Sequence, residues 1–345
     1  MEENILQETQ SIENVQQAPL LQENFFTESS PVTELNQKLQ TLRNEIGKVI
    51  VGQEQVVDLL LIGLFCDGHL LLEGVPGVAK TLASKLLAKI IDVNFSRLQF
   101  TPDLMPGDVL GTSVFNPKEG TFYFKAGPIF SNIVLIDEIN RAPAKTQSAL
   151  FEVMEERQVT ADGVTHKMQY PFIVLATQNP VEQEGTYRLP EAQLDRFLFK
   201  IEIGYPTLKE EIQILTQQQG KTQAQLLEHV NKLLNAEEIA KYREIVQQIK
   251  VDEKLIGYIA ALVHETRNHA SLYLGASTRA SLALLKSAKA TAALKGRDFI
   301  IPEDVQEMAP HVLRHRIMLT PEKEMEGITA DELIQNILKS IEVPR

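Results

Sequence analysis

The sequence predicts an α/β domain with a five-stranded parallel sheet, followed by an all-helical C-terminal domain. Short apolar runs alternate with helical patterns up to residue 205, and strand patterns cease after Tyr205-Pro206. Strands separated by helices favour a mainly parallel sheet that is covered on both faces. The 345 residues are therefore expected to divide into a tail (1–33), an α/β part (34–205) and a helical part (206–345).

Each predicted element follows from the spacing of apolar residues. Helical spacing predicts one helix over 35–46 and a buried one over 56–65. Apolar runs bounded by turn residues predict strands at 69–73, 97–100, 133–137, 172–176 and 199–203. In the helical part, helices are expected over 210–219, 236–248, 254–267, 278–294 and 302–316.

The composition is that of an ordinary globular protein, with 43% hydrophobic and 23% charged residues. A single cysteine, Cys66, excludes an internal disulfide framework and a multi-cysteine metal site, and it fits a reducing, cytoplasmic compartment. His311 and His315 lie four apart on one helical face, but no acid completes a metal site inside that helix, so a structural or interface role is expected. The net charge of −12 disfavours broad attraction to nucleic acid or anionic lipid.

Half of that charge lies at the front, because residues 1–40 carry −6. Residues 1–33 have few apolar side chains, so we expect an acidic, disordered tail that is either a solubilising extension or a docking peptide. The tail lacks the basic start and apolar run of a signal peptide. Since no stretch reaches the roughly 18 apolar residues of a membrane helix, no membrane insertion is expected.

A phosphate-binding loop is predicted where the first strand meets a helix. The segment reads Gly74-Val75-Pro76-Gly77-Val78-Ala79-Lys80-Thr81, followed by Leu82. In such a loop, backbone N–H groups face the phosphates, the lysine reaches the β- and γ-phosphates and the threonine ligates magnesium. The strict pattern has glycine where Ala79 stands, and a helical or near-helical backbone would let alanine fit. The competing interpretation is a strand–turn–helix with an incidental Lys-Thr.

Polar residues at the ends of two further strands complete this site. Asp137 and Glu138 end an apolar strand, at the sheet edge where open α/β sheets bind ligands. Asp137 would hold Mg²⁺ through its water shell, and Glu138 would polarise the attacking water as a general base. Asn179 follows the next predicted strand, where its amide can reach both a γ-phosphate oxygen and that water.

Together these residues resemble the AAA+ ATPases, and specifically the MoxR family. The similarity spans about residues 40 to 320 and rests on the phosphate-binding loop and on four further strings: Asp137-Glu138-Ile139-Asn140-Arg141-Ala142-Pro143, Ala176-Thr177-Gln178-Asn179-Pro180, Leu189-Pro190-Glu191-Ala192-Gln193-Leu194-Asp195-Arg196-Phe197 and Gly275-Ala276-Ser277-Thr278-Arg279-Ala280. The resemblance implies an AAA+ nucleotide-binding core with a helical lid.

The family's functional residues carry over onto matching positions. Asn179 matches the first sensor, Arg279 the second sensor in the lid, and Arg196 the arginine finger that enters the neighbouring subunit's site. Val51-Gly52-Gln53 resembles the segment beside the adenine. Arg141 and Arg188 are either interface arginines or surface charges. A finger supplied in trans implies a homo-oligomeric ring, which in this family is expected to be hexameric.

Two predicted β-hairpins resemble insertions of the branch that contains MoxR, magnesium chelatase and the MCM helicases. The first surrounds Asn116–Gly120 and the second turns at Ala161-Asp162-Gly163. They are expected either to grip a client as the nucleotide state changes or only to pack between subunits. The second tip carries an acid and no cation, which disfavours nucleic-acid translocation because phosphate contacts dominate such binding.

The sequence therefore predicts an ATP- and Mg²⁺-dependent ATPase that remodels a protein client. By resemblance, the partner is expected to be a protein with a von Willebrand factor A domain. Two alternatives remain open. One is an MCM-like nucleic-acid translocase, and the other is a nucleotide-dependent scaffold with little turnover, which the intact Lys80, Asp137, Glu138 and Arg196 disfavour.

Overall fold

The computed structural model describes residues 30–180, 187–220 and 223–344. The expected disorder of the tail falls on residues 1–29, outside these ranges, and stays a prediction. Residues 31–33 belong to helix α1 (Pro31–Gly47), and Val32 is buried. Helix α1 therefore begins three residues before the expected boundary at residue 34.

The α/β part is built on a five-stranded parallel sheet in the order β2-β5-β8-β1-β9. The strands are β1 (His69–Gly74), β2 (Phe95–Gln99), β5 (Ile133–Asp137), β8 (Ile173–Gln178) and β9 (Phe197–Ile203). This confirms the predicted sheet, with strand ends shifted by at most two residues. Because all five strands are parallel, their carboxyl ends lie along one edge.

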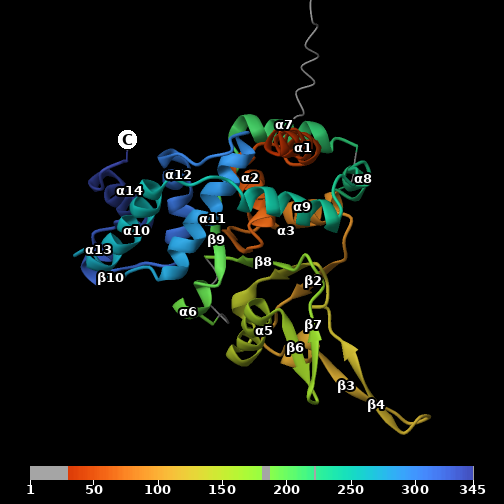
Figure 1. Cartoon of the computed structure of the whole chain (residues 1–345). Helices are drawn as coiled ribbons and strands as arrows, with labels where there is room; N and C mark the ends of the chain where they lie inside the picture. The colour runs from red at the N-terminus through yellow and green to blue at the C-terminus, as the bar shows by residue number, and fades with distance from the viewer. Residues whose placement is uncertain (1–29, 181–186, 221–222, 345) are drawn as a thin grey trace, which may run out of the picture. The chain divides into compact units, whose positions relative to one another are not determined.

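Helices cover both faces of the sheet, as Figure 1 shows. Leu70 and Leu72 of β1 pack into the core that includes α2 (Glu54–Phe65) and α3 (Lys80–Ile90), whereas Leu71 packs into the core of α5 (Ala144–Glu156). Both faces of the central strands are therefore apolar, because successive side chains point to opposite sides. This explains the continuous apolar runs in the sequence.

The two predicted hairpins are confirmed. They are β3 (Gly111–Asn116) with β4 (Thr121–Ala126), and β6 (Gln158–Ala161) with β7 (Val164–Lys167). Figure 1 shows both extending from the α5 side of the sheet. The hairpins contact each other, because Phe124 stacks on His166 with 4.2 Å between ring centroids and the hydroxyl of Ser113 donates to Asp162. Short α4 (Pro106–Leu110) leads into β3, and η1 (Ile139–Arg141) follows β5.

The C-terminal part is helical, as predicted. Its helices, with α6 (Glu191–Leu194) preceding them, are α7 (Leu208–Gln218), α8 (Gln223–Glu228), α9 (Ala236–Gln247), α10 (Glu253–Asn268), α11 (Thr278–Leu294), α12 (Pro302–Leu313), α13 (Pro321–Met325) and α14 (Ala330–Ser340). Sequence patterning did not predict a small antiparallel sheet of β10 (Leu272–Leu274) and β11 (Met318–Leu319). These strands are too short to show a period of two. None of the helices in the described ranges is long and apolar enough to cross a membrane.

The segment after α12 joins the helical part to the sheet. The Arg316 guanidinium is 3% exposed, donates to the carbonyl oxygens of Phe197 and Leu198, and lies 2.7 Å from the Asp195 carboxylate. Burial lowers the pKa of Arg316, and Asp195 opposes that shift. His315 also hydrogen-bonds the Phe197 carbonyl through Nε2 at 3.0 Å, so within the chain this histidine has a structural role.

Candidate active site

The loop between β1 and α3 brings the predicted phosphate-binding residues to the carboxyl edge of the sheet. A Cβ on Gly74 would lie 2.5 Å from the carbonyl oxygen of Ile203, so only glycine fits there. Gly77 has a φ of +88°, and Ala79 has φ +64° and ψ +17° directly before the first residue of α3. Ala79 does take a helical backbone, but a left-handed one, which costs an L-residue about 1–2 kcal/mol.

The Lys80 side chain folds back over this loop. Its ammonium group donates to the carbonyl oxygen of Gly74 and lies 3.4 Å from the carbonyl oxygens of Val75 and Gln178. Val75 belongs to the loop, and Gln178 is the last residue of β8. The lysine therefore lies where β1 and β8 both end.

The predicted magnesium ligands meet at the end of β5. The Asp137 carboxylate is buried, and its Oδ1 lies 3.3 Å from the Thr81 hydroxyl and 3.2 Å from the Thr177 hydroxyl. Thr177 also accepts a hydrogen bond of 3.0 Å from the backbone N–H of Glu138. This threonine of β8 therefore orients both acidic residues, a role that the sequence prediction missed.

Two side chains of β2 hold the acidic pair, and the sequence prediction missed both. Arg97 Nε lies 2.7 Å from Asp137 Oδ2, and Gln99 Nε2 donates to Glu138 Oε2 at 2.7 Å. The two residues are two apart, so they point from the same face of β2. The polar alternation within this strand was the one available signal, because Arg97 and Gln99 flank an apolar Leu98.

Glu138 is fixed from a second side as well. Its backbone is left-handed, with φ +57° and ψ +53°, and Arg141 Nε lies 3.0 Å from the same Oε2 that Gln99 contacts. Arg141 therefore faces the acid of its own subunit in this structure. Asn179, the residue after β8, is 7% exposed and follows the carbonyl of Gln178 that Lys80 approaches.

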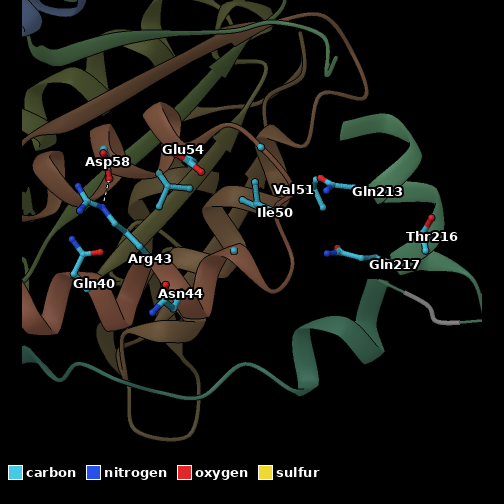
Figure 2. Close-up of a pocket in the computed structure, with 13 residues that line it drawn as sticks. Gln40, Arg43, Asn44, Ile50, Val51, Glu54, Asp58, Gln213, Thr216 and Gln217 are labelled. Carbon is cyan, nitrogen blue, oxygen red and sulfur yellow. Dashed lines mark hydrogen bonds and ion pairs between the residues drawn. The ribbon is translucent and has the colours of Figure 1, made fainter. Parts of the chain in front are cut away.

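The predicted adenine segment lies beside α7. A Cβ on Gly52, whose φ is +66°, would lie 2.0 Å from Glu210 Oε1. Val51 and Gly52 line a groove of about 890 Å³ whose other walls come from α1, α2 and α7. Figure 2 shows Val51 beside Gln213 of α7, with Arg43 and Asp58 joined by an ion pair on the far wall. No residue of the phosphate-binding loop lines this groove, so the structure brings Val51 and Gly52 to α7 and not directly to Lys80.

Arg196 and Arg279 lie together at the amino ends of the strands, opposite the carboxyl ends that carry Lys80 and Asp137. Arg196 precedes β9, whose first residue, Phe197, pairs with His69 at the start of β1. Glu155 of α5 binds both arginines: Arg196 Nη2 at 2.9 Å and Arg279 through its Nη2. Arg279 therefore does not lie at the predicted phosphate-binding loop of its own subunit. The packing of the lid determines where this arginine lies. Arg188, 85% exposed in its side chain, lies 3.7 Å from Glu191.

Other buried ionisable groups near the sheet are structural. Burial raises the pKa of the Cys66 thiol to about 12, which rules out a thiolate nucleophile at neutral pH. Burial lowers the pKa of His69 to about 4, and its neutral imidazole contacts the Met154 carbonyl oxygen through Nε2 and accepts from the Val174 N–H through Nδ1, both at 3.0 Å. Within the described ranges, no cluster of three or more His, Cys, Asp or Glu residues could hold a metal ion by itself.

Comparison with known proteins places the chain in a family. Residues 69–199 match the ATPase family associated with various cellular activities (AAA), and residues 264–337 match the AAA lid domain. The chain is 49% identical over 299 residues to the uncharacterized protein YeaC of Bacillus subtilis, covering 87% of this chain and 92% of YeaC. It is 44% identical over 310 residues to the chaperone MoxR1 of Mycobacterium tuberculosis, covering 87% and 81% of the two chains.

A solved structure agrees with these sequence relatives. The crystal structure of a candidate ATPase from Cytophaga hutchinsonii has a TM-score of 0.84 and 43% sequence identity, covering 91% of this chain and 97% of that one. With its α/β core and its helical lid, the chain belongs to the MoxR family of AAA ATPases.

Proposed function

We propose that the chain binds ATP with Mg²⁺ at the carboxyl edge of the sheet and hydrolyses it. The observation that carries this proposal is the meeting of three strand ends. The loop with Lys80, the Asp137–Glu138 pair and Asn179 lie at the carboxyl ends of β1, β5 and β8, which are neighbours in the sheet. Backbone N–H groups at the start of α3 and the Lys80 ammonium would bind phosphate oxygens in place of the carbonyl contacts seen here.

The residues present fit a magnesium ion. A buried carboxylate and a threonine hydroxyl 3.3 Å apart are the hard oxygen donors that Mg²⁺ prefers, and Mg²⁺ commonly keeps most of its waters. Thr81 would ligate the ion, and Asp137 would bind its water shell. The bound ion would neutralise charge on the β- and γ-phosphates. Arg97 now supplies the positive charge next to Asp137, so we expect it to move away when the ion binds.

Glu138 is the proposed general base. Gln99 and Arg141 both bind its Oε2, which leaves the other carboxylate oxygen, Oε1, to accept a proton from the attacking water. Asn179 would orient that water and the γ-phosphate through its amide. The adenine would lie between the segment Val51-Gly52-Gln53 and α7, which already share one groove for two of those residues.

Arg196 and Arg279 are proposed to act on the site of a neighbouring subunit. From the His69–Phe197 pair to the Gly74–Ile203 pair, β1 advances five residues, which is about 17 Å at the rise of a strand. An arginine side chain does not span that distance through a packed sheet. Because one carboxylate holds both arginines, we extend to Arg279 the trans role expected of Arg196, which implies a homo-oligomeric ring.

We infer that the ring acts on a protein client. The similarity to a chaperone supports this role, as does the exposed aromatic surface of the β3–β4 hairpin, where Phe122 is 71% and Tyr123 51% exposed. The nucleic-acid alternative is disfavoured because the β6–β7 turn presents Asp162. A von Willebrand factor A domain protein remains the proposed partner by resemblance.

Two measurements test the catalytic assignment. Glu138→Gln is expected to lower the steady-state ATPase rate at least 100-fold while leaving nucleotide binding intact, since a general base contributes about 10²–10⁴-fold. Lys80→Ala is expected to lower both. Leu98→Ala in β2 serves as a control that changes apolar packing next to the site without removing a polar contact. An ATPase rate that survives either active-site change would contradict the assignment.

Mixed subunits test the ring. Arg196→Ala and Glu138→Gln subunits, each inactive alone, are expected to regain part of the ATPase rate when mixed, because an intact acid can then meet an intact arginine from its neighbour. No recovery at any mixing ratio would refute an arginine acting in trans. A pull-down with the Glu138→Gln form held in ATP, followed by mass spectrometry, tests whether the client is a protein. Captured DNA without captured protein would favour the nucleic-acid translocase instead.

A further inference from the structure

A second cavity lies away from the nucleotide site, where the end of α2 meets α9 and α11. Its volume is about 530 Å³, within the range of small-molecule sites. Phe65 and Asp67 line it from the end of α2, Tyr170 from the segment before β8, and Val246 from α9. One half of the lining is apolar, and the other half carries the charged residues described next.

A buried guanidinium forms part of the cavity wall. Arg243 of α9 is 4% exposed, its Nε donates to the Leu64 carbonyl at 2.8 Å, and its Cζ lies 4.7 Å from the centre of the Tyr170 ring. Its Nη1 lies 2.6 Å from Asp67 Oδ1, and its Nη2 makes no hydrogen bond to an acceptor among the described residues. A buried donor without an acceptor costs free energy, so this fork favours an oxygen ligand.

The charge around Arg243 is not balanced. Asp67 also pairs with Arg157, whose Nη1 lies 2.7 Å from Oδ2, so one carboxylate serves two guanidinium groups. Lys286 and Lys289 of α11 line the same cavity, and no ion pair joins either of them to an acid in the part of the chain that the structure describes. Lys289 Nζ donates to the Gln247 carbonyl at 2.7 Å, and burial lowers the pKa of this lysine.

The balance of charge identifies the kind of ligand. Glu244 is the second acid of the lining, so three cations (Arg243, Lys286 and Lys289) face two carboxylates. Because Arg157, which lies outside the lining, also neutralises Asp67, the cavity keeps an excess of positive charge. An anion matches that excess, and a phosphate monoester is anionic near neutral pH. The Tyr170 ring offers a flat apolar surface beside the guanidinium, which suits a ligand that also carries a planar apolar group.

We propose that this cavity binds a phosphate monoester with a flat apolar group, the phosphate at Arg243, Lys286 and Lys289 and the flat group against Tyr170. The site is separate from the ATP site. Its walls join α2 to α9 and α11 of the lid, so a bound ligand would tie the sheet-covering helices to the lid.

Phenyl phosphate is the probe for this site, measured by isothermal titration calorimetry on the full chain. All binding measurements use the Lys80→Ala variant, so that binding of the probe at the phosphate-binding loop does not contribute to the measured heat. Phenyl phosphate is expected to bind at least tenfold more tightly than inorganic phosphate, which lacks the ring, or phenol, which lacks the charge. In the Lys80→Ala background, the double substitution Lys286→Ala, Lys289→Ala is expected to weaken binding of phenyl phosphate at least tenfold. When Lys80 is left intact, the same double substitution is expected to leave the ATPase rate unchanged.

Controls separate this result from general charge effects. Lys232→Ala removes an exposed lysine outside the cavity and is expected to leave phenyl phosphate binding unchanged. Arg243→Lys keeps the charge but loses the fork and is expected to weaken binding, with circular dichroism reporting whether it folds. Failure of phenyl phosphate to bind, or equal binding by the Lys286→Ala, Lys289→Ala variant, would overturn the proposal.

Discussion

Ala79 offers a sharp test, because one methyl group stands where the backbone favours glycine. Its φ of +64° costs an alanine about 1–2 kcal/mol relative to glycine in the folded state. Glycine in turn loses more conformational freedom on folding, by about 0.5–1 kcal/mol. The difference predicts that Ala79→Gly stabilises the protein by roughly 0.5–1 kcal/mol, because the relief of strain exceeds the entropic loss.

Thermal unfolding measures this change, with the same substitution in a helix as the matched control. Ala261 is exposed in the middle of α10, and Ala261→Gly is expected to destabilise the protein by about 1 kcal/mol. For a folded unit of this size, 1 kcal/mol corresponds to about 1–2 °C in Tm. Ala79→Gly should therefore raise Tm and Ala261→Gly should lower it. A fall in both would refute the reasoning that places strain at Ala79.

Two further predictions concern charge. Burial lowers the pKa of His69 and of His311 to about 4. Below pH 6.5 the unfolded chain therefore binds more protons than the folded one, and the free energy of unfolding falls as the pH falls from 6.5 towards 4. At pH 5 this loss is about 2 kcal/mol for each histidine. Tm should fall steeply between pH 7 and 5, and less so in His311→Gln; an equal fall in that variant would contradict the assignment. Arg97→Ala removes the cation next to Asp137 and is expected to lower the Mg²⁺ concentration needed for half-maximal binding of a fluorescent ATP analogue several-fold, whereas a higher requirement would show that Arg97 does not compete with the ion.

Apolar patterning predicted the sheet well because each central strand is buried on both faces. The runs at β1, β5 and β8 are continuous, and the polar residues that end them had to share one sheet edge once the strands were parallel. The proposed site could therefore be assembled from residues far apart in the sequence. The hairpins were also predictable, because alternation about a glycine-containing turn is a local signal.

What the sequence could not predict depends on contacts between elements. Arg97 and Gln99 belong to no motif, and their roles come from the pairing of β2 with β5, which sets Gln99 opposite Asp137. The position of Arg279 follows from the packing of the lid, which no local pattern encodes. Likewise, the left-handed backbone at Ala79 is hidden, because the residue type argues against it.

Strand β1 has a consequence for communication between subunits. One end of it carries Gly74 and the loop that would hold phosphate, and the other end carries His69, which is bonded to the carbonyl of Met154. The next residue, Glu155, holds both arginines. A stiff strand thus links the nucleotide loop of one subunit to the arginines that it would present to the next. In the proposed ring, this strand would couple the nucleotide state of one subunit to the position of the arginines at its neighbour's site, so that hydrolysis at one site would influence hydrolysis at the next.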